Sequence, residues 1–178
     1  MTRKAGFPAV TDASTRVLIL GSLPGEASLA AQQYYGNPRN AFWRLMEGVL
    51  GAPLVPLAYE DRLTTLLAHG VGLWDVIGEA ERPGSLDAAI RDPAANDLVA
   101  LIDTLPNLRG VAFNGGTAAK LGARLVGDRV PTLALPSSSP AHAARSFGDK
   151  LALWGGIRSW LPSKTASLDT RNRSSTIA

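Results

Sequence analysis

A short glycine-containing loop followed by aromatic and amide side chains is the part of the chain best suited to bind a ligand. Residues 21–25 form this loop and directly follow the apolar run 17–20, which predicts a buried parallel strand. Open α/β sheets bind ligands in such loops, at the carboxyl ends of their strands. Tyr34, Tyr35 and Asn40 follow the loop. Flat rings and an amide with donors and an acceptor are suited to hold a heterocyclic base by its face and edge.

Two later segments repeat the order of an apolar strand followed by a polar loop. Residues 110–113 predict a strand that leads to Asn114, and residues 131–135 predict one that leads into the segment 136–142. Asn114 alone is equally consistent with a tight turn, and three consecutive serines are equally consistent with a helix cap. Serine hydroxyls and free backbone amides at a helix start also bind phosphate well.

The spacing of apolar residues predicts the helices that position these loops. Asn40 is well placed to cap the first helix and Asn96 to cap a later one. Ser139 is expected to cap the last helix, with Pro140 at its first helical position and Pro162 at its end. Helices are expected over residues 42–50, 60–69, 97–105 and 117–126, and a last helix is expected from the segment 136–142 to residue 161. A strand or extended loop is expected over 71–77, and residues 82–87 are expected to form a turn that leads into a short helix. This alternation predicts an α/β fold with three layers, α/β/α, around a short, mostly parallel central sheet.

Length and composition are those expected of one folded domain. The chain has 178 residues, of which 46% are hydrophobic and 19% are charged, and we expect a single domain over 1–162. The Ser- and Thr-rich residues 163–178 lack periodic apolar residues and are expected to form a flexible tail. No apolar run approaches the roughly 20 residues of a membrane helix, and the N-terminal residues do not resemble a secretory signal. A cytoplasmic protein with no membrane partner is therefore expected.

The residue types that are missing exclude several kinds of chemistry. The sequence has no cysteine, which excludes disulfides, thiolate nucleophiles, Cys-ligated zinc and iron–sulfur clusters. His69 and His142 are its two histidines, so we expect neither a metal site nor a cofactor. The formal net charge of +3 permits nucleic-acid binding without requiring it.

The combination and order of these segments resemble the uracil-DNA glycosylase superfamily, and within it the hypoxanthine-DNA (deoxyinosine) glycosylases. The resemblance extends from about Arg16 to Leu161 and rests on residues 21–25, 32–43, 72–77, 84–87, 113–115 and 136–142. It implies an enzyme that flips a damaged nucleotide out of the duplex and cleaves its glycosidic bond with water. Because no lysine matches the Schiff-base nucleophile of strand-cleaving glycosylases, a monofunctional enzyme is indicated.

The resemblance also implies roles for individual residues. Leu23 lies where a sister family has an asparagine that positions the attacking water, so this catalytic role is expected at Asn40, which could instead only cap its helix. Tyr35 is expected to stack on the flipped base, whereas Tyr34 is expected to pack in the core. Asn114 is expected to bind the base edge. The expected base pocket is Gly21, Ser22, Leu23, Pro24, Gly25, Tyr35 and Asn114, and the expected DNA-binding residues are Ser137, Ser138, Ser139, Pro140, Ala141 and His142.

Within the DNA-binding segment, Ser137 lies where some superfamily members have a histidine that steadies the departing base. Donors for the leaving group are therefore expected elsewhere. Asp75 and Asp87 could suggest general acid–base chemistry, but turns and caps explain both residues, so neither is assigned to catalysis.

Three functions remain open from the sequence. The leading hypothesis is a DNA-deoxyinosine glycosylase of base excision repair that acts as a monomer on damaged double-stranded DNA. The first alternative is a uracil or mismatched-thymine DNA glycosylase of the same fold, which Leu23 disfavours. The second is a non-catalytic nucleic-acid or nucleotide binding module, which would have no use for Asn40.

Overall fold

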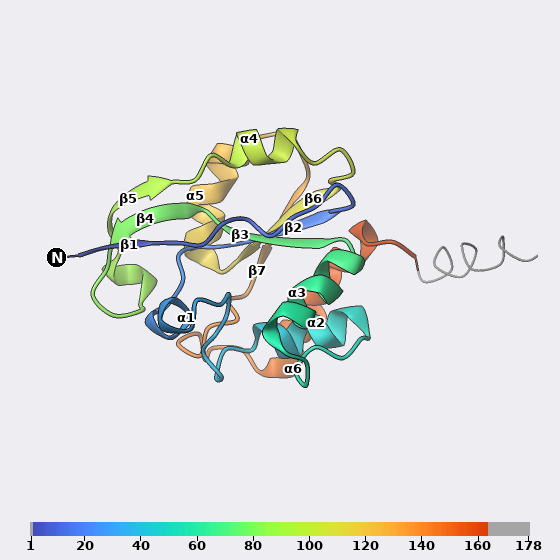
Figure 1. Ribbon diagram of the computed structural model, residues 1–178, viewed down its shortest axis with the longest axis horizontal. Helices are drawn as coiled ribbons and strands as arrows, with labels where there is room; N and C mark the ends of the chain where they lie inside the picture. The colour runs from blue at the N-terminus through green and yellow to red at the C-terminus, as the bar shows by residue number, and fades with distance from the viewer. Residues whose placement is uncertain (1, 164–178) are drawn as a thin grey trace, which may run out of the picture.

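A four-stranded parallel sheet forms the centre of the protein (Figure 1). The computed structural model describes residues 2–163. The sheet has the order β3-β2-β6-β7, with β2 (Val17–Gly21), β3 (Val71–Asp75), β6 (Gly110–Asn114) and β7 (Thr132–Leu135). Val17 of β2 lies between Val71 and Gly110 of the neighbouring strands. The carboxyl ends of these strands therefore meet at one edge, as the sequence predicts.

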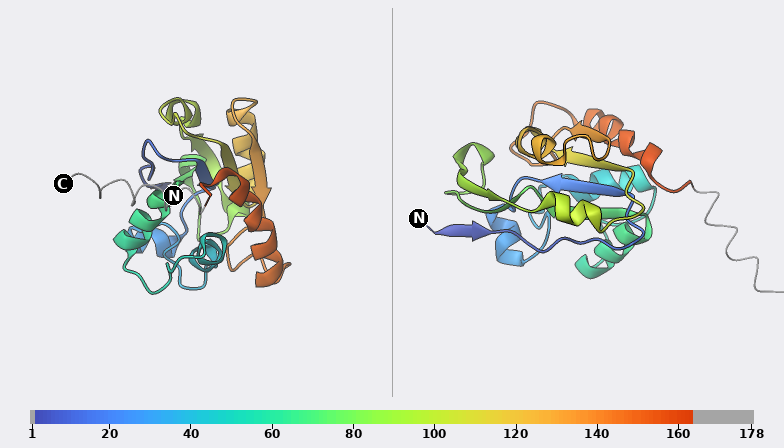
Figure 2. Two further views of the ribbon diagram at one scale, coloured as in Figure 1. Left: turned by 90° about the vertical axis from the view of Figure 1, so that its right-hand side faces the viewer. Right: turned by 90° about the horizontal axis from the view of Figure 1, so that it is seen from above.

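Helices cover both faces of this sheet (Figure 2). Every residue of β2 is buried, and alternate side chains point to opposite faces. Val17 and Ile19 pack in one core, and Leu18 and Leu20 pack in the other. The first core includes α2 (Phe42–Leu50), α3 (Tyr59–Ala68), α6 (Phe147–Trp154) and the 3₁₀ helix η2 (Gly155–Trp160), and the second includes α4 (Leu98–Asp103) and α5 (Gly116–Val126). The predicted three-layer α/β/α fold is confirmed.

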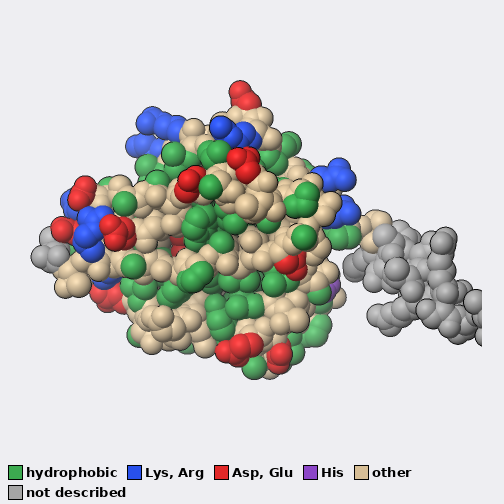
Figure 3. Space-filling model, turned by 45° about the horizontal axis from the view of Figure 1, so that its top comes forward, with side chains coloured by type: hydrophobic (Ala, Val, Ile, Leu, Met, Phe, Trp, Pro, Cys, Tyr) green, Lys and Arg blue, Asp and Glu red, His purple; other side chains and the backbone are tan. Residues whose placement is uncertain are grey.

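A second, antiparallel sheet extends from the carboxyl edge of the first. Its strands are β1 (Arg3–Ala5), β4 (Ile77–Glu81) and β5 (Arg91–Ala95), in the order β1-β4-β5. β4 follows β3 after one residue, and the connection from β4 to β5 contains the 3₁₀ helix η1 (Asp87–Ala89). Charges of both signs lie side by side at this end of the molecule (Figure 3), where Arg3 pairs with Glu79 and Asp92. The sequence does not predict this sheet, because the residues of β5 are all exposed and give no apolar signal.

Two predicted helix starts are wrong. The cap of α4 is Asp97, whose side chain accepts a hydrogen bond from Ala100 N–H at 3.0 Å; Asn96 instead donates to the Asp75 carbonyl at 2.8 Å. No helix begins at Ser139, whose hydroxyl accepts from Ala141 N–H within a turn. The last helix begins later, at α6, with Ser146 as its cap. A short helix, α1 (Glu26–Ala31), was also not predicted.

The expected tail, residues 163–178, lies outside the described residues except for Ser163. Within residues 2–163, no helix is both long and apolar enough to cross a membrane.

Candidate active site

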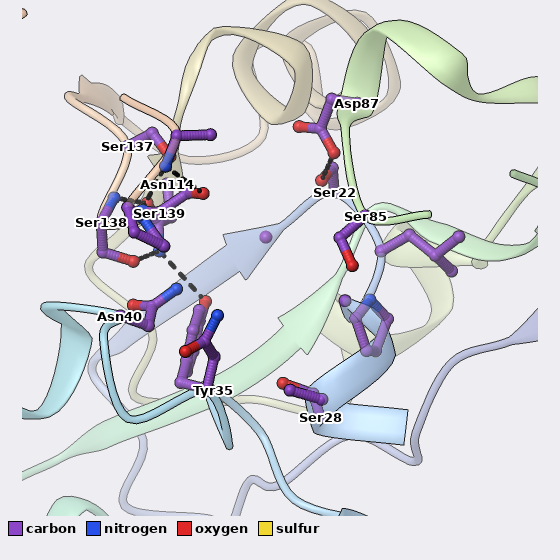
Figure 4. Close-up of a pocket in the computed structure, with 18 of the residues that line it drawn as sticks. Ser22, Ser28, Tyr35, Asn40, Ser85, Asp87, Asn114, Ser137, Ser138 and Ser139 are labelled. Carbon is purple, nitrogen blue, oxygen red and sulfur yellow. Dashed lines mark hydrogen bonds between the residues drawn. The ribbon is translucent and has the colours of Figure 1, made fainter. Parts of the chain in front are cut away.

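The loops at the carboxyl edge of the parallel sheet surround one cleft of about 620 Å³, a volume typical of small-molecule sites. Asn114 and the serine loop (residues 136–142) lie on one side of it, and Ser22, Ser85 and Asp87 lie on the other (Figure 4). Every residue that the sequence analysis assigned to the site lines the cleft: Gly21, Ser22, Leu23, Pro24, Gly25, Tyr35, Asn40, Asn114, Ser137, Ser138, Ser139, Pro140, Ala141 and His142. The fold therefore brings the predicted residues together, while their chemical roles stay predictions.

Gly21 forms the centre of the cleft floor. Its partner in the sheet register is Asp75 on one side, and on the other side β6 ends at Asn114. A Cβ atom at Gly21 would lie 2.5 Å from Asp75 Oδ1 and 3.3 Å from the Tyr35 hydroxyl. Glycine is needed here because neighbouring polar side chains already occupy the space that a side chain would fill.

The Asn114 amide is held in one orientation by Ser138. Ser138 N–H donates to Asn114 Oδ1 at 2.9 Å, and Asn114 Nδ2 donates to the Ser138 hydroxyl at 2.9 Å and to the Tyr35 hydroxyl at 3.3 Å. A backbone N–H can only donate, so the amide atom that faces it must be the oxygen. Both Nδ2 hydrogens are thus engaged, and one lone pair of Oδ1 remains for a ligand. Ser138 itself is buried, and its hydroxyl points to Asn114 rather than outward.

Asn40 stabilises the start of α2 through its amide oxygen, while its amide nitrogen is available to a ligand. Its Oδ1 accepts a hydrogen bond from Phe42 N–H at 2.9 Å, which fixes that oxygen toward the backbone. The next residue, Ala41, donates its N–H to the Ser138 carbonyl at 3.0 Å and so ties this loop to the serine loop. No residue within 2–163 accepts a hydrogen bond from Asn40 Nδ2. The structural and catalytic roles that the sequence left as alternatives can therefore coexist in one side chain.

Tyr35 lies against the core on one ring face and lines the cleft. Its ring stacks on Phe42, with ring centroids 3.8 Å apart and an interplanar angle of 16°. Its φ of 54° lies in the left-handed region, which costs a non-glycine residue roughly 1–3 kcal/mol and is found mainly where the surrounding structure imposes it. Burial raises the pKa of its hydroxyl, which stays neutral. Tyr34, in contrast, is buried in the core, as expected, and its hydroxyl donates to the Pro8 carbonyl at 2.8 Å.

A buried arginine that was not predicted as a site residue holds the loop of residues 21–25. Arg82 is 2% exposed, and it donates to the carbonyls of Leu23, Pro24 and Gly84. It also lies 3.8 Å from Asp87, which accepts a hydrogen bond from the Ser22 hydroxyl at 2.8 Å. Because a buried guanidinium needs several acceptors, these contacts fix the shape of the loop.

The serine loop has an anchored base and an exposed tip. Trp154 Nε1 donates to the Pro136 carbonyl at 2.9 Å, and the buried Lys150 donates to the His142 carbonyl at 2.7 Å. Pro140 and Ala141 between these anchors are exposed at the rim of the cleft. His142 Nδ1 is buried without a hydrogen-bond partner among the described residues.

Asp75 also lines the cleft, although the sequence analysis left it out of catalysis. Its side chain is buried, with 4% of the residue exposed, and its Oδ2 has no hydrogen-bond partner within residues 2–163. Burial, and then the negative charge of Asp87, raise the pKa of Asp75 to about 7, with Arg82 acting in the opposite direction. A carboxyl that titrates near neutrality in a cleft is a candidate for acid–base chemistry. The available sequence signal was a polar residue at the end of an otherwise apolar strand.

Comparison with known proteins assigns the chain to a known superfamily. Residues 8–157 match the uracil DNA glycosylase superfamily. A protein named hypoxanthine DNA glycosylase from Methanosarcina acetivorans is 48% identical over 139 residues, which are 78% of this chain and 88% of that protein. A protein of the same name from Methanosarcina barkeri is 41% identical over 152 residues, which are 85% of this chain and 96% of that protein.

A solved structure has the same fold. The solution NMR structure of a candidate uracil DNA glycosylase from Methanosarcina acetivorans superposes with a TM-score of 0.80 at 43% sequence identity, and covers 88% of this chain and 97% of that one. With its family match, its relatives and its fold in agreement, the chain belongs to the uracil DNA glycosylase superfamily.

Proposed function

We propose that the protein is a monofunctional DNA-deoxyinosine glycosylase, which hydrolyses the N-glycosidic bond of a flipped hypoxanthine nucleotide in base excision repair. The observation that carries this proposal is one cleft in which Asn40, Tyr35 and Asn114 converge, in a chain that resembles two proteins named hypoxanthine DNA glycosylase over most of their length. We further propose that residues 1–162 act as one domain, as a monomer, in the cytoplasm, on damaged double-stranded DNA and without a cofactor.

Asn114 supplies a reason to prefer hypoxanthine over adenine. Its free Oδ1 lone pair is an acceptor at the cleft floor. Hypoxanthine presents an N1–H donor on its Watson–Crick edge, whereas adenine presents a lone pair at N1. Adenine would therefore leave two acceptors facing each other and unpaired, and buried polar atoms without partners cost roughly 1–3 kcal/mol each. Uracil, thymine and guanine present a ring N–H in the same way, so this contact rejects adenine and cytosine, the parents of the two deaminated bases, and further contacts must reject guanine and thymine.

The base would stack on the cleft side of Tyr35, whose other face is supported by Phe42. Base–aromatic stacking contributes on the order of 1–3 kcal/mol. The free Asn40 Nδ2 would then hold a water molecule by donating to its oxygen. That water attacks C1′ of the sugar as the bond to the base breaks. Asn40 contributes by orienting a lone pair of the water oxygen toward C1′.

The DNA duplex would contact the serine loop at the rim. Pro140 and Ala141 form the exposed tip, and with His142 they would enter the gap left by the flipped nucleotide. Ser139 and Ser137 would contact phosphate, while Ser138 supports Asn114 from behind. Binding through phosphates predicts that affinity for a lesion duplex falls as salt rises.

Base release from defined duplexes tests this function. The substrates contain hypoxanthine, uracil or no lesion, and the variants are Asn40→Ala and Asn40→Asp. Asn40→Asp keeps an acceptor for Phe42 N–H but lacks the amide donor, so we expect both variants to lose hypoxanthine release. Asn107→Asp is the matched control, because Asn107 is exposed, precedes β6 and donates only to the Ala13 carbonyl among the described residues.

The possible outcomes separate the hypotheses. Binding without release of any base would refute the enzyme assignment. Release of uracil but not of hypoxanthine would favour the alternative substrate, in line with the description of the NMR structure. If Asn40→Asp works as well as the parent protein, Asn40 does not position the water through its amide nitrogen.

A further inference from the structure

Asp75 is a group in the cleft that the proposed function does not use. It ends β3, on the opposite side of Gly21 from Asn114. Neighbouring strands lie about 4.8 Å apart, so the Asp75 and Asn114 backbones are separated by about 10 Å. A flat purine above Gly21 would thus have Asn114 toward one edge and Asp75 toward another.

The chemical state of Asp75 indicates what it would offer such a ligand. An ionised carboxylate without hydrogen bonds is costly to bury, so the neutral acid is favoured in the free cleft. A neutral carboxyl has one O–H donor, and Asp75 Oδ2 is buried with no hydrogen-bond partner within residues 2–163. Buried polar groups are almost always satisfied, which makes an unpaired donor in a cleft a sign of a missing acceptor.

Hypoxanthine carries such an acceptor where it matters for bond cleavage. When the bond from C1′ to N9 breaks, both bonding electrons go to the base, and its five-membered ring becomes negatively charged. N7 belongs to the same ring as N9, so a proton placed on N7 cancels this charge. Uracil has no N7.

We propose that Asp75 is the general acid of the reaction and transfers its proton to N7 of the flipped purine as the glycosidic bond breaks. The inference rests on the proposed function. The C1′–N9 electron pair leaves with the base, N7 gains the proton of Asp75, and hypoxanthine departs as a neutral molecule. The oxygen of water bonds to C1′ and loses one proton, and the Asp75 carboxylate takes up a proton to restore the acid. No oxidant, reductant or further reactant is needed.

The groups around Asp75 set the direction of the pH dependence. Asp87 opposes its ionisation, Arg82 favours it, and Tyr34 and Tyr35 are neutral hydroxyls nearby. With a pKa of about 7 for the free protein, the acid form is lost as pH rises. The rate of hypoxanthine release at low substrate concentration should therefore fall above pH 7.

Single-turnover base release from two duplexes tests the inference. One contains deoxyinosine, and the other contains 7-deaza-deoxyinosine, in which carbon replaces N7. Asp75→Asn keeps the size of the side chain and a hydrogen-bond donor but has no transferable proton. We expect it to release hypoxanthine roughly 100-fold or more slowly than the parent and without the fall above pH 7. On the 7-deaza duplex the parent should already be slow, and Asp75→Asn should cause no further loss.

Other results would overturn the assignment. An equal loss on both substrates would mean that Asp75 only supports the cleft, and a parent rate that rises through pH 7 would mean that the ionised carboxylate is the active form. Asp75→Asn should still bind the 7-deaza duplex with parental affinity, measured by fluorescence anisotropy, which shows that the cleft is intact. If the parent releases no hypoxanthine, the proposed function fails; if parent and Asp75→Asn release it equally, the role of Asp75 alone fails.

Discussion

Replacement of Asp75 by asparagine should make the stability of the folded protein less sensitive to pH. In the folded protein the pKa of Asp75 is raised from 3.8 to about 7, mainly by burial. Between these two values the folded chain holds a proton that the unfolded chain has released. The free energy of unfolding therefore falls as pH rises from about 4 to about 7, because the carboxyl must ionise where it is poorly solvated. The amide that replaces the carboxyl in the variant is neutral at every pH, so the variant lacks this loss.

The size of the effect follows from the pKa values. One pKa unit corresponds to about 1.4 kcal/mol. At pH 5 the unfolded carboxyl is already ionised, and two further pH units separate pH 5 from the folded pKa of about 7. Between pH 5 and pH 8.5 the parent should therefore lose about 3 kcal/mol of stability relative to Asp75→Asn. Other titrating groups contribute equally to both proteins and cancel in this comparison.

Urea unfolding of both proteins at pH 5 and pH 8.5 measures the difference. At pH 5 the neutral acid and the amide have similar shapes, so the two free energies of unfolding should be similar. At pH 8.5 the variant should be the more stable protein. A change in their difference of less than about 0.5 kcal/mol between the two pH values would refute the reasoning, because an error of two pKa units would be needed to produce it. It would also remove the physical basis for an acid at this position.

Substitutions at three further positions test the construction of the cleft. Gly21→Ala should lower the free energy of unfolding, measured in urea, by about 1–3 kcal/mol, because its Cβ would lie 2.5 Å from Asp75 Oδ1. The control Gly116→Ala should have little effect, since no atom lies within 4 Å of the added Cβ. Equal losses in both variants would contradict the close packing of Asp75 against Gly21. Arg82→Met should cost at least about 2 kcal/mol in the same assay, since it leaves buried carbonyls without donors, and an unchanged urea midpoint would show that the loop holds its own shape. Tyr35→Phe should keep the affinity for a hypoxanthine duplex, measured by fluorescence anisotropy, while Tyr35→Ala should lose about 1–3 kcal/mol of it; similar losses in both variants would show that the hydroxyl, not the ring, binds.

The parts of the fold that the sequence predicted are those with a strong local signal. The apolar run at residues 17–20 is buried on both sides in β2, and short apolar runs of this kind have few other uses in an α/β protein. The residues of the cleft were predicted because each follows a strand or begins a loop, and parallel strands place such residues at one edge. The resemblance to the superfamily depended on the same segments, and the family match confirms it.

The features that were missed depend on contacts between distant segments. β1 and β5 are short and largely exposed, and their pairing with β4 could not be read from their own residues. Ser139 followed by Pro140 is a good local helix start, but this segment forms a turn instead, held by Lys150 from the following helix. Arg82 was overlooked because an arginine between a strand and a turn is usually exposed, and its burial depends on carbonyls of residues 23 and 24, far away in the sequence.

The side-chain amides of Asn40 and Asn114 make different hydrogen bonds, so the same substitution to aspartate tests a different property at each position. Each accepts a backbone N–H through its oxygen, Asn40 from Phe42 and Asn114 from Ser138. Among the described residues nothing accepts from the amide hydrogens of Asn40, so Asn40→Asp removes a donor and leaves the anchor in place. Asn114 has both hydrogens engaged by the hydroxyls of Ser138 and Tyr35, which can reverse direction and donate to a carboxylate. Activity lost in Asn40→Asp therefore reports on the water, whereas Asn114→Asp would keep its internal contacts and change mainly the charge that the base meets.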